Sequence, residues 1–296
     1  MSDSSNLVIG IVAKPQPGGN LPALEGLLRH LDERGLKPIL DPEAARLARR
    51  PDAQVAQRCD LPPLVDLVVV LGGDGTLLSV ARHLGGRPIP ILGVNLGSLG
   101  FLTEVSTDEM LPTLDLCLQG RASVQSRMAL DATLRRDGAT LATYSCLNDV
   151  VLNKSAMARI IEVRVEVGGD WLTDMRADGL IVATPTGSTA YNLSAGGPIL
   201  APGVDGIILV PICPHTLTMR PIVLDGSHPV DITLLRGSEE VFLTADGQTG
   251  SPVKVGDCIR VMRAPKGVPL VTSPHRSYFA LIREKLGWGL RYPEKG

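Results

Sequence analysis

Aromatic side chains are scarce in this sequence of 296 residues and make up 3% of it. Proteins that hold single-stranded nucleic acid stack its bases on aromatic rings, so the scarcity argues against that class. The formal net charge of −2 leaves no excess of positive charge for a broad surface that binds nucleic acid or an anionic membrane. We therefore expect no nucleic-acid partner and no membrane partner.

Cysteine is sparse as well, because the chain has five, an odd number, and they form no Cys-x-x-Cys pair. Neither a zinc site nor a disulfide framework is indicated, and the five histidines show no metal-binding spacing. We expect no metal site built from protein side chains alone. The first apolar run, Leu7 to Ala13, is too short for a signal-peptide core with charged flanks or for a membrane span. These absences predict a cytoplasmic protein.

Two widespread nucleotide-binding motifs are missing. The chain contains no Gly-x-x-x-x-Gly-Lys-Ser/Thr sequence, so any phosphate site must do without a P-loop lysine. No Gly-x-Gly-x-x-Gly follows a predicted strand, which argues against a nicotinamide-dependent dehydrogenase.

The chain is organised around a different glycine-rich stretch, residues 67 to 76, with the sequence Leu-Val-Val-Val-Leu-Gly-Gly-Asp-Gly-Thr. Its β-branched beginning favours a strand that is buried on both faces of a parallel sheet. Leu77, Leu78, Ala81 and Leu84 then recur at helical spacing. The glycines thus lie between the carboxyl end of a strand and the start of a helix, where open α/β sheets bind ligands.

We interpret Gly72, Gly73, Gly75 and Thr76 as a phosphate-binding turn. Glycines can adopt backbone angles barred to other residues, and they let main-chain N–H groups approach a phosphate at a helix N-terminus. A carboxylate repels phosphate, so Asp74 makes sense there if it holds a cation or accepts a proton from an attacking hydroxyl. The alternative is that Asp74 caps the helix and that the glycines only form a tight turn.

The length predicts two domains, and the first comprises residues 1–122. Short apolar strands alternate with amphipathic helices there, which is typical of an open, helix-flanked parallel sheet. A second turn, Asn95 to Phe101, follows the strand after the glycine stretch. We expect it at the same edge of the sheet, lining the cleft beside Asp74. The alternative is a plain loop whose Phe101 packs in the core.

Residues 123–275 follow a period of two, with predicted hairpin turns at Asp137-Gly138 and Gly168-Gly169, so this part is expected to be mostly β. The last segment, residues 276–296, contains a predicted helix over Tyr278 to Leu286 that packs back onto other parts of the fold.

Polar clusters interrupt the β-rich part. Asn148-Asp149 precedes a strand, and an amide beside a carboxylate can bind vicinal hydroxyls or an adenine edge, although this dipeptide is also common in turns. Residues 176–179, Arg-Ala-Asp-Gly, precede the next strand. Thr184 to Pro198 holds many hydroxyls and few charges, which indicates a neutral, hydrogen-bonding ligand surface rather than a metal cage. The alternative is a Ser/Thr-rich loop.

The glycine stretch, Asn148-Asp149 and Thr184 to Tyr191, at these distances, closely resemble the NAD kinase family, and the resemblance spans about Leu7 to Leu286. Gly-Gly-Asp-Gly-Thr alone is shared with diacylglycerol, sphingosine and phosphofructokinase-type kinases. The resemblance implies an α/β N-terminal domain, an all-β, sandwich-like domain that binds the dinucleotide, a last segment that returns to the first domain, and a homo-oligomer, either a dimer or a tetramer. It also implies an enzyme that uses ATP and a divalent cation, Mg²⁺, to phosphorylate the 2′-hydroxyl of the adenosine ribose of NAD, which gives NADP.

The resemblance assigns roles to single residues. Asp74, with Gly75, matches the general base at the ribose 2′-hydroxyl, and Phe101 matches a residue of the cleft wall. Asn148 and Asp149 match the pair that binds adenine and ribose hydroxyls, where many members have Glu in the second place. Around the adenine and the nicotinamide end, the matching residues are Asp178 and Thr186, and those of the loop that encloses adenine are Thr189, Ala190, Tyr191, Asn192, Leu193 and Ser194.

Three further residues match single features of the family. Arg159 and Arg176 match basic groups near the pyrophosphate or a subunit contact, and Gln248 matches a polar contact to ribose. In the family, an arginine at the place of Arg176 is associated with a preference for NAD over NADH.

The residues leave two alternative functions. Another kinase of the diacylglycerol and sphingosine type would need an apolar acceptor groove, and the hydroxyl-rich loop argues against one. A protein that senses NAD without catalysis would not need Asp74, which is intact.

Overall fold

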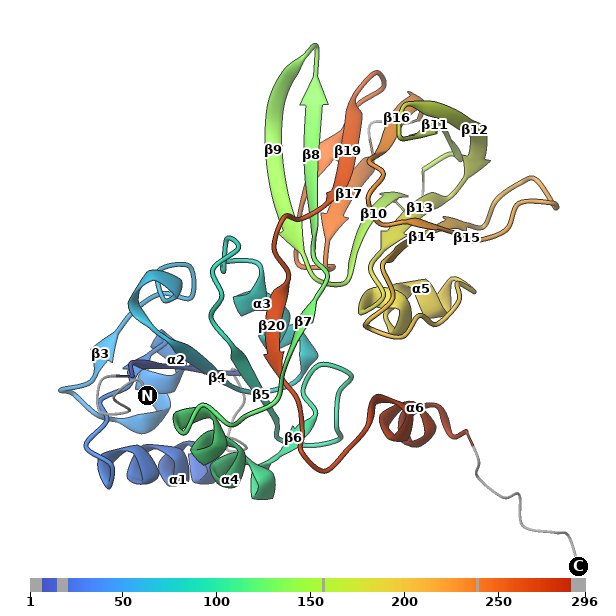
Figure 1. The fold of residues 1–296 in the computed structure, drawn as a ribbon. Coiled ribbons are helices and arrows are strands. Elements are labelled where there is room, and N and C mark those ends of the chain that lie inside the picture. Colours follow the sequence, from blue (N-terminus) through green and yellow to red (C-terminus); the bar gives the residue numbers. More distant parts are fainter. Residues whose placement is uncertain (1–6, 15–20, 156–157, 238–239, 289–296) are drawn as a thin grey trace, which may run out of the picture. The chain divides into compact units, whose positions relative to one another are not determined.

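The structure is a computed structural model that describes residues 7–14, 21–155, 158–237 and 240–288. The chain forms two compact units, and Figure 1 shows the course of the chain through each of them. The first unit comprises residues 1–80, 88–126 and 269–296, and the second unit comprises residues 81–87 and 127–268.

The first unit is built on an eight-stranded sheet in the order β3-β2-β1-β4-β5-β20-β7, with β6 paired to β5. The pairings from β3 to β20 are parallel, as is that of β5 with β6, which confirms the predicted open parallel sheet. Its strands are β1 (Ile9–Ala13), β2 (Ile39–Leu40), β3 (Gln54–Val55), β4 (Leu67–Leu71), β5 (Ile91–Asn95), β6 (Val105–Ser106), β7 (Val124–Arg127) and β20 (Val268–Val271).

Helices flank this sheet. One core cluster joins the buried leucines of the first helix to β1, β4 and β5, and it also includes apolar residues of the second and fourth helices. A capping box of Ser106 and Glu109 starts the fourth helix, and the last helix has the predicted bounds. The helices are α1 (Leu21–Asp32), α2 (Pro42–Ala48), α3 (Asp74–Ala81), α4 (Thr107–Leu118), α6 (Tyr278–Leu286) and the 3₁₀ helix η2 (Pro62–Leu64).

The strand order gives the first unit a topological switch point between β1 and β4. From β1 the chain moves outward through β2 and β3 and returns to β4 on the other side of β1. Ligands of open parallel sheets bind at the carboxyl ends of such neighbouring strands. The two carboxyl ends are joined by a hydrogen bond from the Lys14 N–H to the Leu71 carbonyl, 2.9 Å long. The glycine turn begins at the next residue, Gly72.

The second unit contains two antiparallel sheets of six strands, in the orders β15-β14-β13-β10-β17-β18 and β12-β11-β16-β19-β8-β9. The strands of the former are β10 (Asp149–Lys154), β13 (Gly179–Ala183), β14 (Gly206–Ile212), β15 (Ile222–Asp225), β17 (Val241–Ala245) and β18 (Thr249–Val253). Those of the latter are β8 (Leu130–Arg136), β9 (Ala139–Cys146), β11 (Ile161–Val167), β12 (Asp170–Ala177), β16 (Val230–Arg236) and β19 (Cys258–Arg263).

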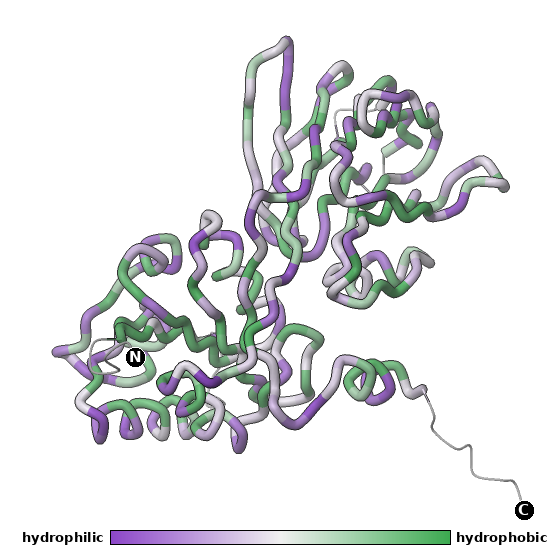
Figure 2. The backbone as a smooth tube through the Cα atoms, viewed as in Figure 1, coloured by the Kyte–Doolittle hydropathy of each residue, from purple (hydrophilic) through white to green (hydrophobic). Residues whose placement is uncertain are grey.

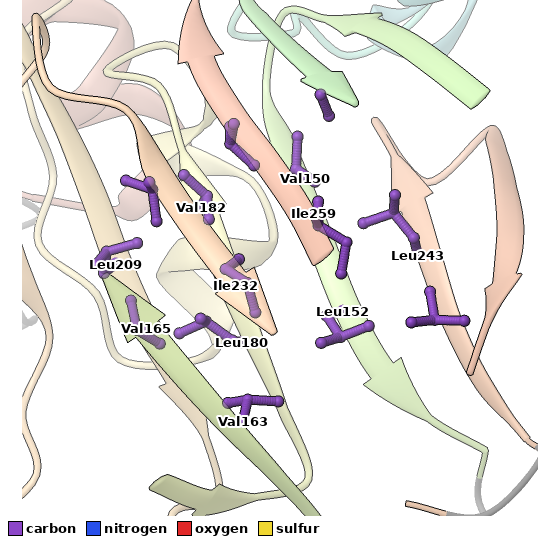
Figure 3. Packing of buried hydrophobic residues seen from close by; sticks show 14 of the residues in the cluster. Val150, Leu152, Val163, Val165, Leu180, Val182, Leu209, Ile232, Leu243 and Ile259 are labelled. Atoms are coloured by element: carbon purple, nitrogen blue, oxygen red, sulfur yellow. The ribbon is translucent and has the colours of Figure 1, made fainter. Parts of the chain in front are cut away.

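Alternate side chains of the two sheets form one apolar core. Figure 3 shows Val163, Val165, Ile232 and Ile259 of one sheet together with Val150, Leu152, Leu180, Val182, Leu209 and Leu243 of the other. The predicted turns Asp137-Gly138 and Gly168-Gly169 connect antiparallel strands, and all four residues have a positive φ. The expectation of an all-β, sandwich-like second domain is confirmed.

The outer face of the sheet that contains β10 is buried as well. Val151, Ile181 and Ile208 cluster there with Leu200, which lies in the segment after β13. This segment includes the 3₁₀ helix η3 (Gly187–Thr189) and α5 (Tyr191–Ser194). Both faces of β13 and β14 are covered, which accounts for their almost continuously apolar sequences. Figure 2 shows hydrophobic residues along β14, as it does along β4.

Candidate active site

Asp74 is the first residue of α3, and the turn that follows β5 binds its carboxylate. Oδ2 accepts a hydrogen bond from the Phe101 N–H at 2.9 Å. Oδ1 accepts hydrogen bonds from the N–H groups of Leu102 at 3.2 Å and Thr103 at 3.0 Å, and from the Thr103 hydroxyl at 2.9 Å. The prediction that this turn lies beside Asp74 is confirmed. None of these bonds goes to α3, so the carboxylate holds the turn and does not cap its own helix.

A second layer fixes the residues that hold Asp74. The Thr103 hydroxyl accepts a hydrogen bond from Asn95 Nδ2 at 3.0 Å, and Asn95 Oδ1 accepts one from the Gly97 N–H at 2.7 Å. Asn95 and Thr103 are both buried. A Cβ atom at Gly100 would lie 1.9 Å from Asp74 Oδ1, so only glycine fits there. The position of the carboxylate is therefore set by the backbone of a packed turn.

The glycine turn differs from the sequence prediction in its backbone angles. None of Gly72, Gly73 and Gly75 has a positive φ, so the expectation that they adopt angles barred to other residues is wrong. Gly72 is required for space, because a Cβ there would lie 2.7 Å from the hydroxyl oxygen of Thr76, which is itself buried. A Cβ at Gly73 would meet no atom within 4 Å. The turn is thus tight at Gly72 and open at Gly73.

Phe101 lies on the turn and is half-buried. The Nζ atom of Lys285, on α6, lies 6.0 Å from the centre of its ring, within the range of a cation–π interaction. Just before α6, Arg276 donates hydrogen bonds to the Glu104 carbonyl at 3.2 Å and the Glu109 carboxylate at 2.9 Å. These contacts connect the end of the described chain to the turn that holds Asp74.

The second unit contains a pocket of about 490 Å³ at the start of β10, lined by both polar and apolar residues. Four of the predicted site residues line it, namely Asn148, Asp149, Ala190 and Tyr191. The other lining residues are Val151, Asn153, Lys154, Ser155, Phe242, Thr244, Asp246 and Gly247.

The backbone of Asn148 and Asp149 is bound from two sides. Asp246, in the turn between β17 and β18, accepts hydrogen bonds from the N–H groups of Leu147 at 2.9 Å, Asn148 at 2.7 Å and Asp149 at 3.2 Å. Thr184 donates its N–H to the Asn148 carbonyl at 2.9 Å and its hydroxyl to the Leu147 carbonyl at 2.6 Å. No described residue hydrogen-bonds to the side chains of Asn148 and Asp149, which therefore remain available to a ligand in the pocket.

Asp149 is 4% exposed and lies near the carboxylate of Asp246. Burial, and then the negative charge of Asp246, raise the pKa of Asp149 to about 7. Burial also raises the pKa of Asp246, although its three backbone hydrogen bonds and the charge of Arg82 oppose that shift. Near neutral pH, Asp149 can therefore both donate and accept a hydrogen bond.

The hydroxyl-rich segment after β13 is bound mainly to itself. Ser188 donates its hydroxyl to the Pro185 carbonyl at 2.6 Å and accepts a hydrogen bond from the Leu200 N–H at 3.0 Å. Asn192 is buried and donates its side-chain amide to the Ser188 carbonyl at 2.7 Å. The hydroxyls of Thr184 and Ser188 thus have partners within the protein, and the expectation of a hydrogen-bonding ligand surface stays a prediction for the other hydroxyls of this segment.

The other predicted residues of this loop differ in burial and in hydrogen bonding. The Thr189 hydroxyl donates to the Thr186 carbonyl at 3.3 Å. Thr186 is buried, and its own hydroxyl has no hydrogen-bond partner among the described residues. Leu193 is half-buried and Ser194 is exposed. None of these four lines the pocket.

The remaining predicted residues also lie outside the pocket lining. Asp178 forms an ion pair of 3.4 Å with Lys154, which does line the pocket. Arg159 and Arg176 are exposed, and the Gln248 side chain accepts a hydrogen bond from Arg82 at 3.0 Å.

Sequence reasoning missed three residues that hold these sites, namely Thr103, Lys154 and Asp246. Asp246 carried one signal, since Asp246-Gly247 lies between two alternating strands as Asp137-Gly138 does. That pattern predicts a hairpin turn but not the direction of the side chain.

Within the described ranges, no group of three or more His, Cys, Asp and Glu side chains could hold a metal ion. Nor do these ranges contain a helix long and apolar enough to cross a membrane.

An open parallel sheet with a fixed carboxylate at its switch point, followed by a β-sandwich with a pocket lined by Asn148 and Asp149, defines a two-unit protein with a candidate catalytic carboxylate. Residues 9–122 match the family described as the ATP-NAD kinase N-terminal domain, and residues 147–273 match the ATP-NAD kinase C-terminal domain. The chain therefore belongs to the NAD kinase family.

Individual relatives agree with this assignment. The chain is 51% identical to the NAD kinase of Geotalea daltonii over 283 residues, which cover 96% of this chain and 99% of the relative. It is 51% identical to the NAD kinase of Geobacter sulfurreducens over 265 residues, or 90% of this chain and 93% of the relative. Among solved structures, yeast NADH kinase complexed with NADH is 29% identical with a TM-score of 0.90, over 98% of this chain and 90% of that chain.

Proposed function

We propose that the chain transfers the γ-phosphoryl group of ATP to the 2′-hydroxyl of the adenosine ribose of NAD, giving NADP, with Asp74 as the general base. The observation that carries this proposal is the Asp74 carboxylate at the carboxyl edge of the parallel sheet, held by four hydrogen bonds. Membership of the NAD kinase family supports the substrates.

The hydrogen bonds of Asp74 are distributed unevenly between its two oxygens. Oδ1 accepts three of them, whereas Oδ2 accepts only the one from Phe101 among the described residues. An ionised carboxylate offers about two lone-pair sites on each oxygen, so Oδ2, which accepts one hydrogen bond, keeps one site with which to accept the proton of an attacking hydroxyl. Transfer of a phosphoryl group depends mainly on positioning and charge stabilisation, and a rigidly held base meets the first need.

The open backbone at Gly73 supports a phosphate site. Apart from Gly73 itself and its chain neighbours, no described residue has an atom within 4 Å of where its Cβ would be, and Gly73 directly precedes α3, whose N-terminus favours negative charge. Asp74 would repel phosphate unless a cation accompanies it, which fits ATP that carries Mg²⁺.

The described side chains do not form a magnesium site by themselves, so we expect Mg²⁺ to bind together with ATP, as MgATP. The described residues offer no cluster of three ligands, and Mg²⁺ is commonly bound through phosphates and waters with one or two carboxylates. When bound to ATP, the ion would neutralise charge on the phosphates. The chain's own residues would position the two substrates and take up the proton.

The pocket of the second unit supports a dinucleotide site. Asn148 and Asp149 present an amide and a carboxyl group that have no hydrogen-bond partner among the described residues, which suits the hydroxyls of a ribose and the edge of an adenine. Ala190 and Tyr191 form part of the same lining. The roles that the family resemblance gives to Arg159, Arg176, Asp178, Thr186, Thr189, Asn192, Leu193, Ser194 and Gln248 stay predictions.

The test is an assay of the purified protein with NAD, ATP and MgCl₂, in which NADP is detected by a dehydrogenase specific for NADP. We expect NADP that depends on both ATP and Mg²⁺. Binding of NAD without formation of NADP would contradict the proposal, and so would phosphate transfer to diacylglycerol in place of NAD.

We further propose that the protein is a cytoplasmic homo-oligomer, either a dimer or a tetramer. The edge strands β12 and β15 expose Trp171, Leu172, Ile222 and Val223. Apolar side chains on an unpaired sheet edge favour association with a second copy. Light scattering after gel filtration measures the mass, and a monomer at assay concentration would contradict this part of the proposal.

A further inference from the structure

Two Asp-Gly turns of the second unit share one backbone conformation. Asp246 has φ 51° and Gly247 has φ 62° in the turn between β17 and β18, and Asp137 and Gly138 have 50° and 79° in the turn between β8 and β9. The side chain of Asp137 is exposed and receives no hydrogen bond from a described residue. The side chain of Asp246 instead accepts three backbone hydrogen bonds. A hairpin turn alone therefore does not explain the contacts of Asp246.

These contacts fix the short segment from Leu147 to Asp149, between β9 and β10. Three consecutive N–H groups point at one carboxylate, and the Asp246 N–H donates in return to the Asp149 carbonyl at 2.9 Å. On the opposite side, a Cβ at Gly187 would lie 2.0 Å from the Asn148 carbonyl oxygen, so the loop packs directly against this backbone. The segment has no room to shift toward Gly187 if Asp246 is lost.

We propose that Asp246 is a positioning residue for the dinucleotide, because its carboxylate holds the Leu147–Asp149 backbone so that the side chains of Asn148 and Asp149 face the pocket. This inference rests on the proposed function, since it assigns the NAD adenosine to that pocket. Asp246 acts through the two residues that it orients, and it is not required to touch NAD.

The charge of Asp246 provides a readout that a purely structural role would not give. The proximity of its carboxylate raises the pKa of Asp149 beyond the effect of burial. The other ionisable groups nearby are Arg82, whose charge acts on Asp246, the buried thiol of Cys146, and Lys154 and Tyr191 in the pocket lining. Removing the charge at residue 246 lowers the pKa of Asp149, so the ionisation of Asp149 moves to lower pH.

The experiment compares two substitutions at this position. Asp246→Asn keeps the size and shape of the side chain but removes its charge. One carboxylate oxygen becomes an NH₂ group, which cannot accept a hydrogen bond from the backbone N–H groups. Asp246→Glu keeps the charge, but it moves the carboxylate by one methylene from the three N–H groups. Asp137→Asn is the matched control, because it changes the same residue type in the same kind of turn. The measurements are KM for NAD, KM for ATP, the dissociation constant of NAD from pH 5.5 to 8.5 without ATP, and the melting temperature.

Both substitutions at residue 246 are expected to raise KM for NAD about tenfold or more, because charge-assisted hydrogen bonds that fix the binding residues are lost. KM for ATP is expected to change less than about twofold. The midpoint of the pH dependence of NAD binding moves to lower pH in Asp246→Asn and stays in place in Asp246→Glu. Asp137→Asn behaves as the unsubstituted protein does.

The result that overturns the proposal is a KM for NAD in both variants within about twofold of the Asp137→Asn control. A variant that melts below the assay temperature is assayed for NAD binding at 10 °C, where the same contrast decides. If the unsubstituted protein forms no NADP, the proposed function fails. If it forms NADP and the two variants match the control, only the role of Asp246 fails.

Discussion

Gly100→Ala tests whether the backbone turn sets the position of the Asp74 carboxylate. The added Cβ would lie 1.9 Å from Asp74 Oδ1 and 2.5 Å from the Thr103 hydroxyl oxygen. Because real Cβ contacts are not shorter than 3.0 Å, the carboxylate or the turn must move by about 1 Å. The substitution leaves every ionisable group of the site in place. Any loss of activity therefore reports the position of the base and not its removal.

The expected magnitude follows from the contacts that must give way. Displacing the turn weakens up to four hydrogen bonds to one carboxylate and overpacks the buried site around Gly100. We expect the free energy of unfolding to fall by about 2–4 kcal/mol. A displacement of about 1 Å at a reacting group can cost about 10²-fold in rate, so kcat is expected to fall by at least that factor.

Gly97→Ala is the control, because it lies in the same turn. The nearest atom to its Cβ would be Asn95 Oδ1 at 4.0 Å, and its φ is not positive. We expect stability and kcat close to those of the unsubstituted protein. Both variants are assayed for NADP formation at saturating NAD and ATP, and their unfolding is followed in urea.

The reasoning would be refuted by a Gly100→Ala variant that keeps both its kcat and its stability. A variant that loses stability but keeps kcat would show that the turn supports the fold and that the base tolerates displacement. Equal losses in Gly97→Ala would show that the turn is sensitive to any added methyl group and that the contact with Asp74 is not the cause.

Three further predictions concern the two sites. Asp74→Asn is expected to lower kcat by about 10²–10⁴, the range for loss of a general base, while calorimetry shows retained NAD binding; an unchanged kcat would exclude the role. Asn148→Ala is expected to raise KM for NAD with a smaller effect on kcat, because a ground-state contact is lost, and steady-state kinetics decides this. The raised pKa of Asp149, about 7 against 3.8, means that the folded state binds more protons between these values, so stability falls as pH rises through this window. Asp149→Asn is expected to remove this loss, of the order of 2–4 kcal/mol, and urea unfolding at pH 5 and pH 8 measures it; an unchanged pH dependence would contradict the shift.

Much of the first unit could be predicted because its signals are local. The run of valines before Gly72 favours a strand buried on both faces, and the first helix carries an apolar stripe of leucines at helical spacing. Strand order follows from such alternation with few choices. The contact between Asp74 and the turn after β5 was also predictable, because carboxyl ends of neighbouring parallel strands meet at one edge.

The conformation of the glycine turn could not be predicted from residue types. Glycine can be required by a positive φ, or by the close approach of another atom, and both give the same letter in a sequence. At Gly72 and Gly100 the second reason holds, since a Cβ would lie 2.7 Å from the Thr76 hydroxyl and 1.9 Å from Asp74. Only coordinates distinguish the two.

The directions of the polar side chains in the second unit could not be predicted from the sequence either. Hydroxyls in the segment after β13 have two possible partners, a ligand or the loop itself, and composition does not decide between them. The Thr184 hydroxyl accepts a hydrogen bond from the Gly187 N–H of the loop and donates one to the Leu147 carbonyl, and the Ser188 hydroxyl donates to the Pro185 carbonyl of the loop. For Asp246 the sequence predicts only a hairpin turn. Its side chain nevertheless contacts residues about a hundred positions away in the sequence.

Each of the two units contains a carboxylate that is held by three consecutive backbone N–H groups, but the carboxylate has a different role in each. In the first, the carboxylate of Asp74 is held by the N–H groups of three consecutive residues, 101–103. In the second, the carboxylate of Asp246 is held by those of residues 147–149. Consecutive N–H groups form a concave site for an anion, and backbone atoms cannot move as a side chain can. In the first case the carboxylate is the group proposed to react and the backbone supports it. In the second case the backbone carries the binding side chains and the carboxylate supports them, which is why loss of charge should affect kcat at Asp74 and KM for NAD at Asp246.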